Sequence, residues 1–297
     1  MADKIYMKWW GCGDFDVLMG DVNVAFDPYR FGEDREQAEP IYDYIFISHE
    51  HFDHLHLYSL EKLCKGERFK KLFVPPGCLE APPDAGFHGF MPIDRHIPSE
   101  KIEVVYPKYR TDEGAGDDAR QFPGPFEIDL GPIRVEVVES GENDRPDLPT
   151  NGYLITHVEK NLSVYHTGDL HEIFPALEHI KGRVDYLVHM KTALNDWDVM
   201  SRFLDYIEPR FFIPTHYRTD RATDPIPAGQ WPPNIDDVNA YIEDLRDHIG
   251  ERTKILPFTA GVRYEVELPS KRVNWKWEWF NTWGAGEICW EPLPQDE

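Results

Sequence analysis

The chain has 297 residues, of which 54 are Asp or Glu and 31 are Lys or Arg, so its formal net charge at pH 7 is −23. A chain of this length forms one large domain or two small ones and can bury a sizeable hydrophobic core. The negative charge disfavours nucleic acids and anionic membrane surfaces as partners, because Lys and Arg supply most of the affinity for both.

Signals for export or for a membrane span are missing from the hydrophobic pattern. No apolar run reaches the roughly 18 residues of a membrane-spanning helix. The opening Met-Ala-Asp-Lys-Ile-Tyr-Met has neither the basic nor the apolar region of a signal peptide. We therefore expect a soluble, cytoplasmic protein, and the composition leaves open whether it forms a homo-oligomer.

The four cysteines form no Cys-x-x-Cys pair and show no disulfide-like spacing. They are Cys12, Cys64, Cys78 and Cys289. A reducing compartment explains this pattern, and we expect these thiols to be small residues of the core rather than reactive groups.

The first part of the chain predicts strands, with apolar residues at every second position and turns at Gly or Asp-Pro. A continuous apolar run at 42–48 is too short for a typical helix and predicts a strand buried on both faces. Leucines spaced as on one face of a helix predict a helix at 55–65. The strands expected in this part lie at 5–10, 15–19, 22–26, 42–48 and 71–74.

Residues 81–126 are rich in Pro, Gly and acidic residues, and we expect a loop-rich segment that could close over a site as a lid. Beyond it, strands and helices alternate, which is typical of an α/β layered fold. The expected strands lie at 133–138, 152–157, 162–166, 186–188, 211–214, 255–258 and 264–268. The expected helices lie at 173–179, 199–207 and 235–249.

The C-terminal segment is rich in tryptophan, with Trp275, Trp277, Trp279, Trp283 and Trp290 in the last 23 residues. Alternate residues from Val273 to Trp279 would share one face of a strand. We expect one domain over 1–270 and a Trp-rich extension over 271–297 packed on it. An alternative is that these rings wall a substrate pocket or a contact between subunits.

The segment Ser48-His49-Glu50-His51-Phe52-Asp53-His54 carries the strongest chemical signal. Packing does not explain three imidazoles and two carboxylates so close together at the end of a buried strand. A turn there can point alternate side chains into one cavity, so that His49 and His51 bind one metal ion while Asp53 and His54 face a second. Imidazole and carboxylate ligands suit zinc, manganese or iron.

This His-x-His-x-Asp-His pattern resembles the metallo-β-lactamase superfamily, and three other segments resemble that family in the same order. They are 22–28, which ends in Asp-Pro; 165–169, which ends in Gly-Asp; and 212–217, which contains Pro-Thr-His-Tyr. The last two elements resemble the branch that contains ascorbate-6-phosphate lactonase and N-acyl-phosphatidylethanolamine phospholipase D. The resemblance implies an αββα sandwich of two mixed sheets with helices on the outer faces.

The resemblance also implies a dinuclear centre with two divalent cations, zinc in the first place and iron or manganese as alternatives. The implied ligands are His49, His51, Asp53, His54, Asp169 and His216, with Asp169 bridging the two ions. His166, just before the Gly-Asp element, would support the site without being a ligand.

One ligand of the family pattern is missing, because relatives carry a histidine between the first motif and Gly-Asp. The spacing puts Glu142 at that position, with Glu139 and Asp144 as less favoured candidates. Either Glu142 is a ligand of the first metal ion, or the segment has drifted, Glu142 is solvated and that ion is weakly held or absent.

The function implied first is a metal-dependent hydrolase that uses a hydroxide bridging two metal ions to attack a small-molecule substrate, which is a lactone, an amide or a phosphoester. Asp53 would orient the nucleophile or take its proton, and His171, His189 and Tyr217 are candidates for binding substrate. The alternative is a di-iron oxygenase on the same fold, in which Glu142 replaces a histidine ligand. A third possibility is a binding protein that has lost catalysis.

Overall fold

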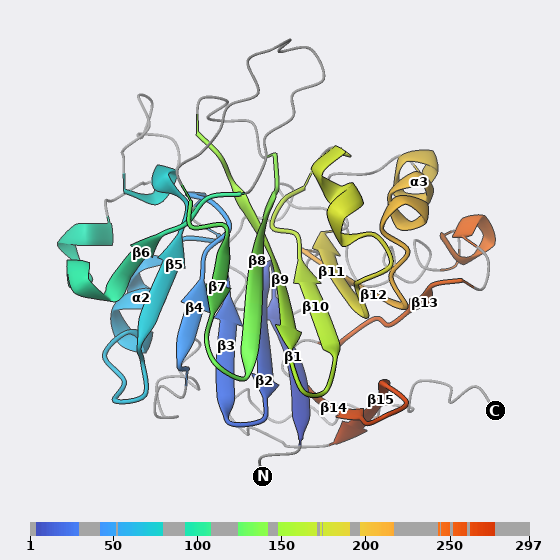
Figure 1. Ribbon diagram of the computed structural model, residues 1–297, viewed down its shortest axis with the longest axis horizontal. Coiled ribbons are helices and arrows are strands. Elements are labelled where there is room, and N and C mark those ends of the chain that lie inside the picture. The colour runs from blue at the N-terminus through green and yellow to red at the C-terminus, as the bar shows by residue number, and fades with distance from the viewer. Residues whose placement is uncertain are drawn as a thin grey trace, which may run out of the picture.

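Two β-sheets packed face to face form the centre of the molecule, and most helical segments lie outside them (Figure 1). This is a computed structural model. It describes residues 4–29, 42–51, 53–79, 93–107, 124–141, 148–170, 173, 175–190, 197–216, 243, 245–249, 252–259 and 262–276.

The first sheet has eight strands in the order β15-β14-β1-β2-β3-β4-β5-β6. Its strands are β1 (Ile5–Gly11), β2 (Asp14–Met19), β3 (Val22–Phe26), β4 (Tyr44–Phe46), β5 (Lys71–Val74), β6 (Ile102–Val104), β14 (Arg263–Glu267) and β15 (Arg272–Lys276). The pairs from β15 to β3 are antiparallel, and the pairs from β3 to β6 are parallel. The sheet is therefore mixed, as expected.

The second sheet has seven strands in the order β13-β12-β11-β10-β9-β8-β7. Its strands are β7 (Glu127–Asp129), β8 (Ile133–Glu139), β9 (Asn151–His157), β10 (Leu162–His166), β11 (Tyr186–Met190), β12 (Phe211–Thr215) and β13 (Lys254–Ile255). Here β7 to β10 pair antiparallel, and β10 to β13 pair parallel. Each sheet thus joins an antiparallel half to a parallel half.

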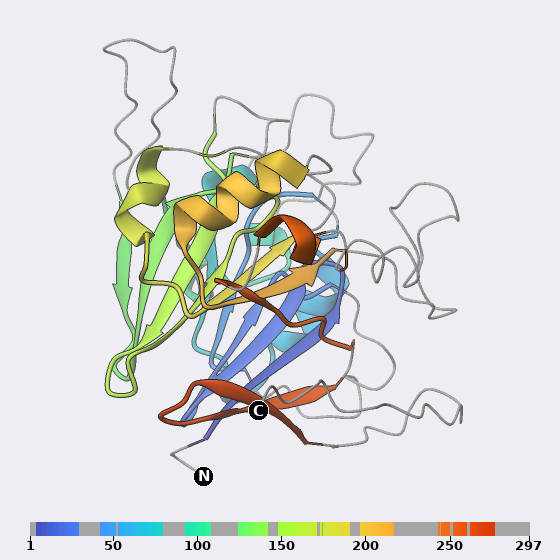
Figure 2. The ribbon, with the colours of Figure 1, turned by 90° about the vertical axis from the view of Figure 1, so that its right-hand side faces the viewer.

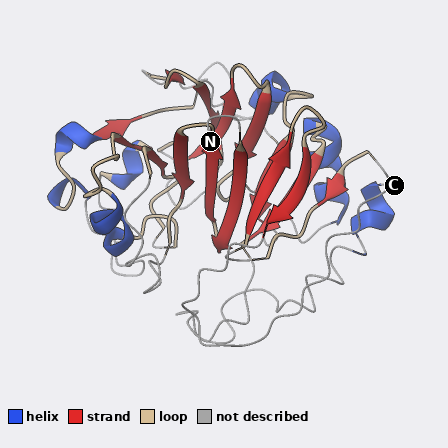
Figure 3. Ribbon diagram, turned by 90° about the horizontal axis from the view of Figure 1, so that it is seen from below, coloured by secondary structure: helices blue, strands red, loops and turns tan. Residues whose placement is uncertain are grey.

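The helical elements lie at the periphery of the strands (Figures 2 and 3). They are α2 (Leu57–Leu63), α3 (Trp197–Ile207) and the 3₁₀ turns η1 (Pro76–Cys78), η2 (Ile93–Arg95), η3 (Ser99–Lys101) and η4 (Pro175–Ile180). Leu60 and Leu63 of α2 pack with Ile45 and Leu72 on the outer face of the first sheet. The large core cluster includes Phe203 of α3 together with residues of both sheets. The predicted sandwich of two mixed sheets is therefore confirmed.

Three predicted elements differ from the structure in extent or type, and a fourth is described only in part. The strand expected at 255–258 is the two-residue strand β13, Lys254–Ile255. The strand expected at 42–48 ends at Phe46, because Ser48 N donates a hydrogen bond to the Asp27 carboxylate instead of continuing the ladder. The helix expected at 173–179 is the six-residue 3₁₀ segment η4, a geometry that short helical pieces favour. Only the end of the helix expected at 235–249 is described, and there Leu245 and Ile249 are buried.

The segment 81–126 is not loop throughout. Within it, β6 pairs with β5, and Ile93 and Ile97 are buried in the cluster that covers the first sheet. Residues 93–107 are therefore part of the layered fold. The other parts of the segment expected as a lid, 81–92 and 108–123, lie outside the described residues, so the lid stays a prediction.

At the C-terminus, β15 pairs with β14 and so extends the first sheet. The remaining Trp-rich residues, 277–297, lie outside the described part, and the division at residue 270 stays a prediction. Among the helices that the structure describes, none has the length and apolar character needed to cross a bilayer.

A buried tyrosine ties the second sheet to the loop that follows β4. Tyr153 donates from its hydroxyl to Ile47 O at 2.6 Å, and Asn151 N donates to Ser48 O at 2.9 Å. Tyr165 is equally buried, but its hydroxyl has no hydrogen-bond partner among the described residues. The two tyrosines therefore form a matched pair for measuring this tie.

We expect Tyr153→Phe to lower the free energy of unfolding by about 1–3 kcal/mol, because the Ile47 carbonyl loses its buried donor. Tyr165→Phe should be neutral or stabilising, because it removes a hydroxyl that is buried without a partner. Urea unfolding of both variants measures the difference. Equal losses in the two variants would contradict this account of the tie.

Candidate metal centre

The predicted ligand segments meet at the carboxyl ends of strands from both sheets. The histidine motif follows β4, Asp169 follows β10 and His216 follows β12. The turn between β1 and β2 joins them at the same place. The carboxyl edge of parallel strands is where α/β folds commonly bind ligands, because loops from several strands converge there.

The carboxylate of Asp27, directly after β3, organises the start of the motif. Ser48 donates to it twice, from N to Oδ1 at 2.6 Å and from Oγ to Oδ2 at 2.6 Å. His54 Nδ1 lies 2.8 Å from Asp27 Oδ2. This contact holds the ring so that its other nitrogen, Nε2, faces away from Asp27, as in metal sites where a carboxylate orients a histidine ligand.

One group of donor atoms belongs to His49, His51 and Asp169, which lie within 4.8 Å of one another. His49 is fully buried, and its Nδ1 lies 2.9 Å from Ser48 Oγ. Its Nε2 has no hydrogen-bond partner among the described residues and lies 3.9 Å from Asp169 Oδ2. A buried ring nitrogen left without a partner is costly, and a cation bound here would satisfy it.

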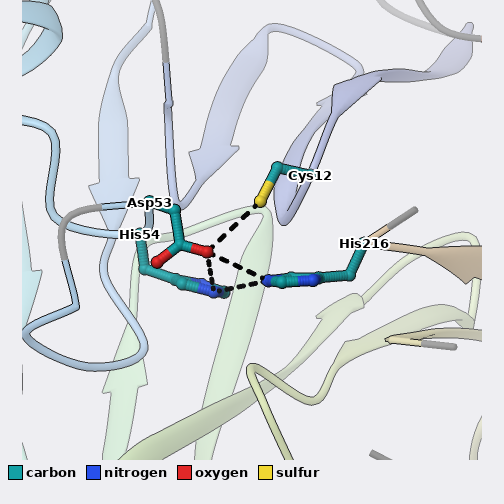
Figure 4. A group of neighbouring side chains, drawn as sticks. All are labelled: Cys12, Asp53, His54 and His216. Atoms are coloured by element: carbon teal, nitrogen blue, oxygen red, sulfur yellow. Dashed lines mark hydrogen bonds and ion pairs between the residues drawn. The ribbon is translucent and has the colours of Figure 1, made fainter. Parts of the chain in front are cut away.

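A second group of donors belongs to Cys12, Asp53, His54 and His216, again within 4.8 Å of one another (Figure 4). The Nε2 atoms of His54 and His216 are 3.1 Å apart. Asp53 Oδ2 lies 3.2 Å from His216 Nε2 and 3.5 Å from Cys12 Sγ. Imidazole, carboxylate and sulfur atoms therefore converge on one point.

Asp169 lies between the two groups. Its Oδ1 is 3.2 Å from His54 Nε2, and its Oδ2 is 3.6 Å from His216 Nε2. The preceding Gly168 has φ +58°, and a Cβ built there would lie 2.7 Å from Ser48 Cβ. Glycine is therefore needed for the turn that brings Asp169 to both groups.

Three residues of the centre hold a left-handed backbone without being glycine: Cys12, Asp27 and His216. Their φ angles are 49°, 44° and 58°. Such conformations cost roughly 1–3 kcal/mol each and persist where surrounding contacts impose them. One such contact is the hydrogen bond from His216 N to Cys12 O at 2.9 Å.

Burial and neighbouring charge shift the ionisation of these groups in opposite directions. Burial alone would lower the pKa of His216, but the carboxylates of Asp169 and Asp53 raise it to about 9. Burial opposes ionisation of Asp169, yet His216 and His54 hold its pKa well below the usual range. Burial, together with His54 and His51, lowers the pKa of His49. The carboxylates thus require positive charge nearby, whether from protonated histidines or from a bound cation.

The structure brings together six residues expected as ligands: His49, His51, Asp53, His54, Asp169 and His216. The expected ligand Glu142, its alternative Asp144, and the expected substrate contacts His171 and Tyr217 lie outside the described residues. Glu139 is described and buried at the end of β8.

His189 and His166 lie close to the centre in different surroundings. His189 Nδ1 is 2.7 Å from Thr167 Oγ1, and its ring packs on Phe203 of α3. Its role in substrate binding stays a prediction. His166 donates from Nε2 to Gly13 O at 2.8 Å and stacks on Phe26, a supporting position.

Sequence reasoning missed the parts that Cys12 and Asp27 play. In the sequence, Asp27 is identified only as part of an Asp-Pro ending, because the pairing of its strand with the motif strand is seen only in the fold. Cys12 was expected to be a core residue. The Gly-Cys-Gly sequence between two expected strands indicates that Cys12 lies in a turn at the end of the sheet, but it does not indicate that Cys12 contacts the histidine motif.

Comparison with known proteins identifies a family to which this chain is similar. The profile described as "Beta-lactamase superfamily domain" matches residues 6–216. A UPF0173 protein of Pyrococcus abyssi (strain GE5 / Orsay) is 25% identical over 217 residues, which cover 71% of this chain and 82% of the relative.

Solved structures of similar fold include proteins with different chemistry. Igni18, described as a novel metallo hydrolase from Ignicoccus hospitalis KIN4/I, matches with a TM-score of 0.57 at 16% identity, covering 89% of this chain and 99% of Igni18. CmlA, described as a diiron beta-hydroxylase from Streptomyces venezuelae, matches with a TM-score of 0.56 at 15% identity, covering 89% of this chain and 54% of CmlA. Identities this low establish likeness of fold alone.

We expect Asp27→Asn to weaken metal binding about 10- to 100-fold, the loss typical when a hydrogen-bond partner behind a ligand is removed. Asp43→Asn is the matched control, because Asp43 is also buried and accepts from Asn23 N, Arg68 and Lys70, outside both donor groups. The measurement is zinc affinity by competition with a chromophoric chelator. Equal weakening in both variants would show a general loss of stability instead.

Proposed function

The chain belongs to the family described as "Beta-lactamase superfamily domain", and on that premise we propose that it is a metal-dependent hydrolase with a dinuclear centre acting on a lactone, an amide or a phosphoester. The observation that carries the proposal is the pair of donor groups with Asp169 between them. Six donors from three strand ends would hold two cations as close neighbours, the arrangement used for hydrolytic displacement.

Two bound cations would supply an acidified water and an electrophile for the substrate's carbonyl or phosphoryl oxygen. The protein's own residues hold and move protons around that reaction. The Asp53 carboxylate, which lies in the second donor group, would orient the attacking water and accept its proton. In the overall reaction, a bond forms from water oxygen to carbon or phosphorus, the bond to the leaving group breaks, and the leaving group takes up a proton.

The charge of the chain bears on the class of substrate. With a net charge of −23, long-range electrostatics disfavour a highly anionic substrate unless positive charge is gathered locally. A neutral lactone or amide, or a phosphodiester with one negative charge, would be repelled less by this net charge. Arg218 and Arg221, which follow His216 closely in the sequence and would supply such positive charge, lie outside the described residues, as does Tyr217, the candidate for binding substrate.

Glu142 is proposed as a ligand of the ion held by His49 and His51. The chain enters the centre just before it, because Ser140 is buried and donates from Oγ to Thr167 O at 2.6 Å. A Cβ on Gly168 would lie 3.0 Å from Ser140 Oγ, so this strand end contacts the Gly-Asp turn. Those contacts support a carboxylate ligand from the residues that follow.

The second candidate function is a di-iron oxygenase, favoured by Glu142 at the histidine position; CmlA, described as a diiron beta-hydroxylase, has a similar fold. Carboxylate-rich sites suit iron better than zinc. The TM-scores of CmlA and Igni18 are nearly equal, so the fold does not choose between the two reactions. Metal content chooses between them.

We expect protein purified without added metal to contain two zinc ions per chain, and removal of zinc by a chelator to abolish hydrolysis of a panel of lactones, amides and phosphodiesters. Zinc should restore it. Two irons per chain with a near-ultraviolet ligand-to-metal band would favour the oxygenase instead. Metal content below one ion per chain would contradict a dinuclear centre.

His54→Ala should remove metal and activity together, because His54 Nε2 lies beside both His216 and Asp169. His96→Ala is the matched control, since His96 pairs with Glu61 and belongs to neither donor group. Elemental analysis and turnover are measured on both variants. Retention of two ions and full turnover by His54→Ala would refute its assignment as a ligand.

Glu142→Ala should lower the metal content from two ions toward one, because the first group would lose a ligand. Glu142→His should keep two ions, since imidazole supplies a donor at the same position. The readout is metal stoichiometry after dialysis. If Glu142→Ala retains both ions with unchanged affinity, the residue is not a ligand.

A further inference from the structure

The turn between β1 and β2 brings a cysteine into the half of the centre that holds His54 and His216. Cys12 Sγ lies 3.5 Å from Asp53 Oδ2 and within 4.8 Å of the ligand nitrogens of both histidines (Figure 4). Cys64 and Cys78, the other described cysteines, lie in or against the cluster around α2 and belong to neither donor group. Cys12 is therefore singled out by position.

We propose that the Cys12 thiolate is a ligand of the metal ion held by Asp53, His54 and His216, and that this sulfur makes the second position of the centre selective for zinc. The inference rests on the proposed function, because it requires that a cation binds there at all. It adds a ligand that neither the motif nor the family likeness supplied.

The spacing of the four donor atoms supports coordination to one ion, and Asp169, which lies between the two groups, would be a fifth ligand of that ion. A tetrahedral zinc ion, with bonds of about 2.0–2.3 Å, separates its ligand atoms by about 3.3–3.6 Å. The measured separations are 3.1 Å between the two histidine nitrogens, 3.2 Å and 3.7 Å from Asp53 Oδ2 to those nitrogens, and 3.5 Å from Asp53 Oδ2 to Cys12 Sγ. These four separations are close to the edges of such a tetrahedron, and the two remaining ones, from Cys12 Sγ to the histidine nitrogens, are within 4.8 Å.

An independent observation points to a cation in the same centre. The buried His49 Nε2 has no hydrogen-bond partner among the described residues and lies beside Asp169, which also reaches His54 and His216. A cation bound between this nitrogen and the Asp169 carboxylate would be coordinated by both and would give the nitrogen the partner it lacks. Cys12 would complete the adjoining half.

The β1–β2 turn is docked on the ligand residues by several contacts. Cys12 O accepts hydrogen bonds from Trp9 Nε1 at 2.8 Å and from His216 N at 2.9 Å. Gly13 O accepts from His166 Nε2, and a Cβ on Gly13 would lie 2.8 Å from His54 Cε1. The thiol is thus held in place from both sides of the turn.

Without a cation, burial and the charge of Asp53 raise the pKa of the Cys12 thiol well above its usual value. A divalent cation inverts this local charge, and a coordinating thiol loses its proton to solvent as the metal–sulfur bond forms. Thiolate favours zinc over manganese, which prefers oxygen ligands. Removing the sulfur should therefore affect zinc far more than manganese.

The test replaces the native metal with cobalt(II), whose near-ultraviolet spectrum contains a sulfur-to-metal band when a thiolate is bound. Wild type, Cys12→Ser and Cys64→Ser are compared, with Cys64→Ser as the matched control because Cys64 lies beside α2. We expect the band in wild type and Cys64→Ser and its loss in Cys12→Ser, with cobalt still bound. Chelator competition should show that Cys12→Ser binds zinc at one of the two positions at least about tenfold more weakly than wild type does. Tenfold is the smallest loss typical of removing a hydrogen-bond partner behind a ligand, and losing the ligand itself should cost no less. The affinity for manganese should change little.

Two outcomes overturn the proposal, and they are distinguishable. Two cobalt ions bound to wild type without a sulfur band, or with a band that persists in Cys12→Ser, would refute Cys12 as a ligand and leave the hydrolase proposal standing. Failure of wild type to bind cobalt, zinc or manganese would overturn the proposed function and this inference together.

Discussion

A group of imidazoles and carboxylates shielded from solvent is the constraint on which the rest of the structure depends. His49, Asp53, His54, Asp169 and His216 are each less than a tenth exposed. Any one of them, charged and alone in the interior, would lose several kcal/mol of hydration. Placed together they balance one another's charge, and a cation would complete that balance. The fold must therefore hold them within about 3–4 Å, the range over which such compensation is strong.

The two sheets meet this requirement by converging at one edge. The motif loop is fixed to the first sheet by Asp27 and to the second sheet by Tyr153 and Asn151. Asp169 and His216 arrive on neighbouring parts of the second sheet, because β10 and β12 both run parallel to β11 between them. The distance between ligands is thus a property of how the sheets pack, and a shift of one sheet against the other would separate them.

The sequence predicts those features that depend on neighbouring residues. Strand periodicity places most strands within one or two residues, but it misses the three-residue strands β6 and β7 and puts β13 at 255–258 instead of 254–255. The histidine motif identifies a metal-binding turn because its ligands are adjacent in the chain. Cys12 escaped prediction because its relation to Asp53 exists only after the β1–β2 hairpin docks, 41 residues away in sequence. The 3₁₀ geometry of η4 escaped for another reason, since apolar spacing does not distinguish it from a short α-helix.

A sulfur donor in this centre would bear on the choice between hydrolysis and oxygen chemistry. Zinc has no redox chemistry and accepts thiolate, imidazole and carboxylate together. Iron that activates oxygen beside a thiolate would expose that sulfur to oxidation, first to the sulfenic and then to the sulfinic state. A cysteine held within 3.5 Å of Asp53 is therefore compatible with a zinc hydrolase and a liability for a di-iron oxygenase. The carboxylate proposed at Glu142 argues in the other direction. Because Glu142 is proposed as a ligand of the other ion, the one held by His49 and His51, the two halves of the centre would then differ in the metal they prefer.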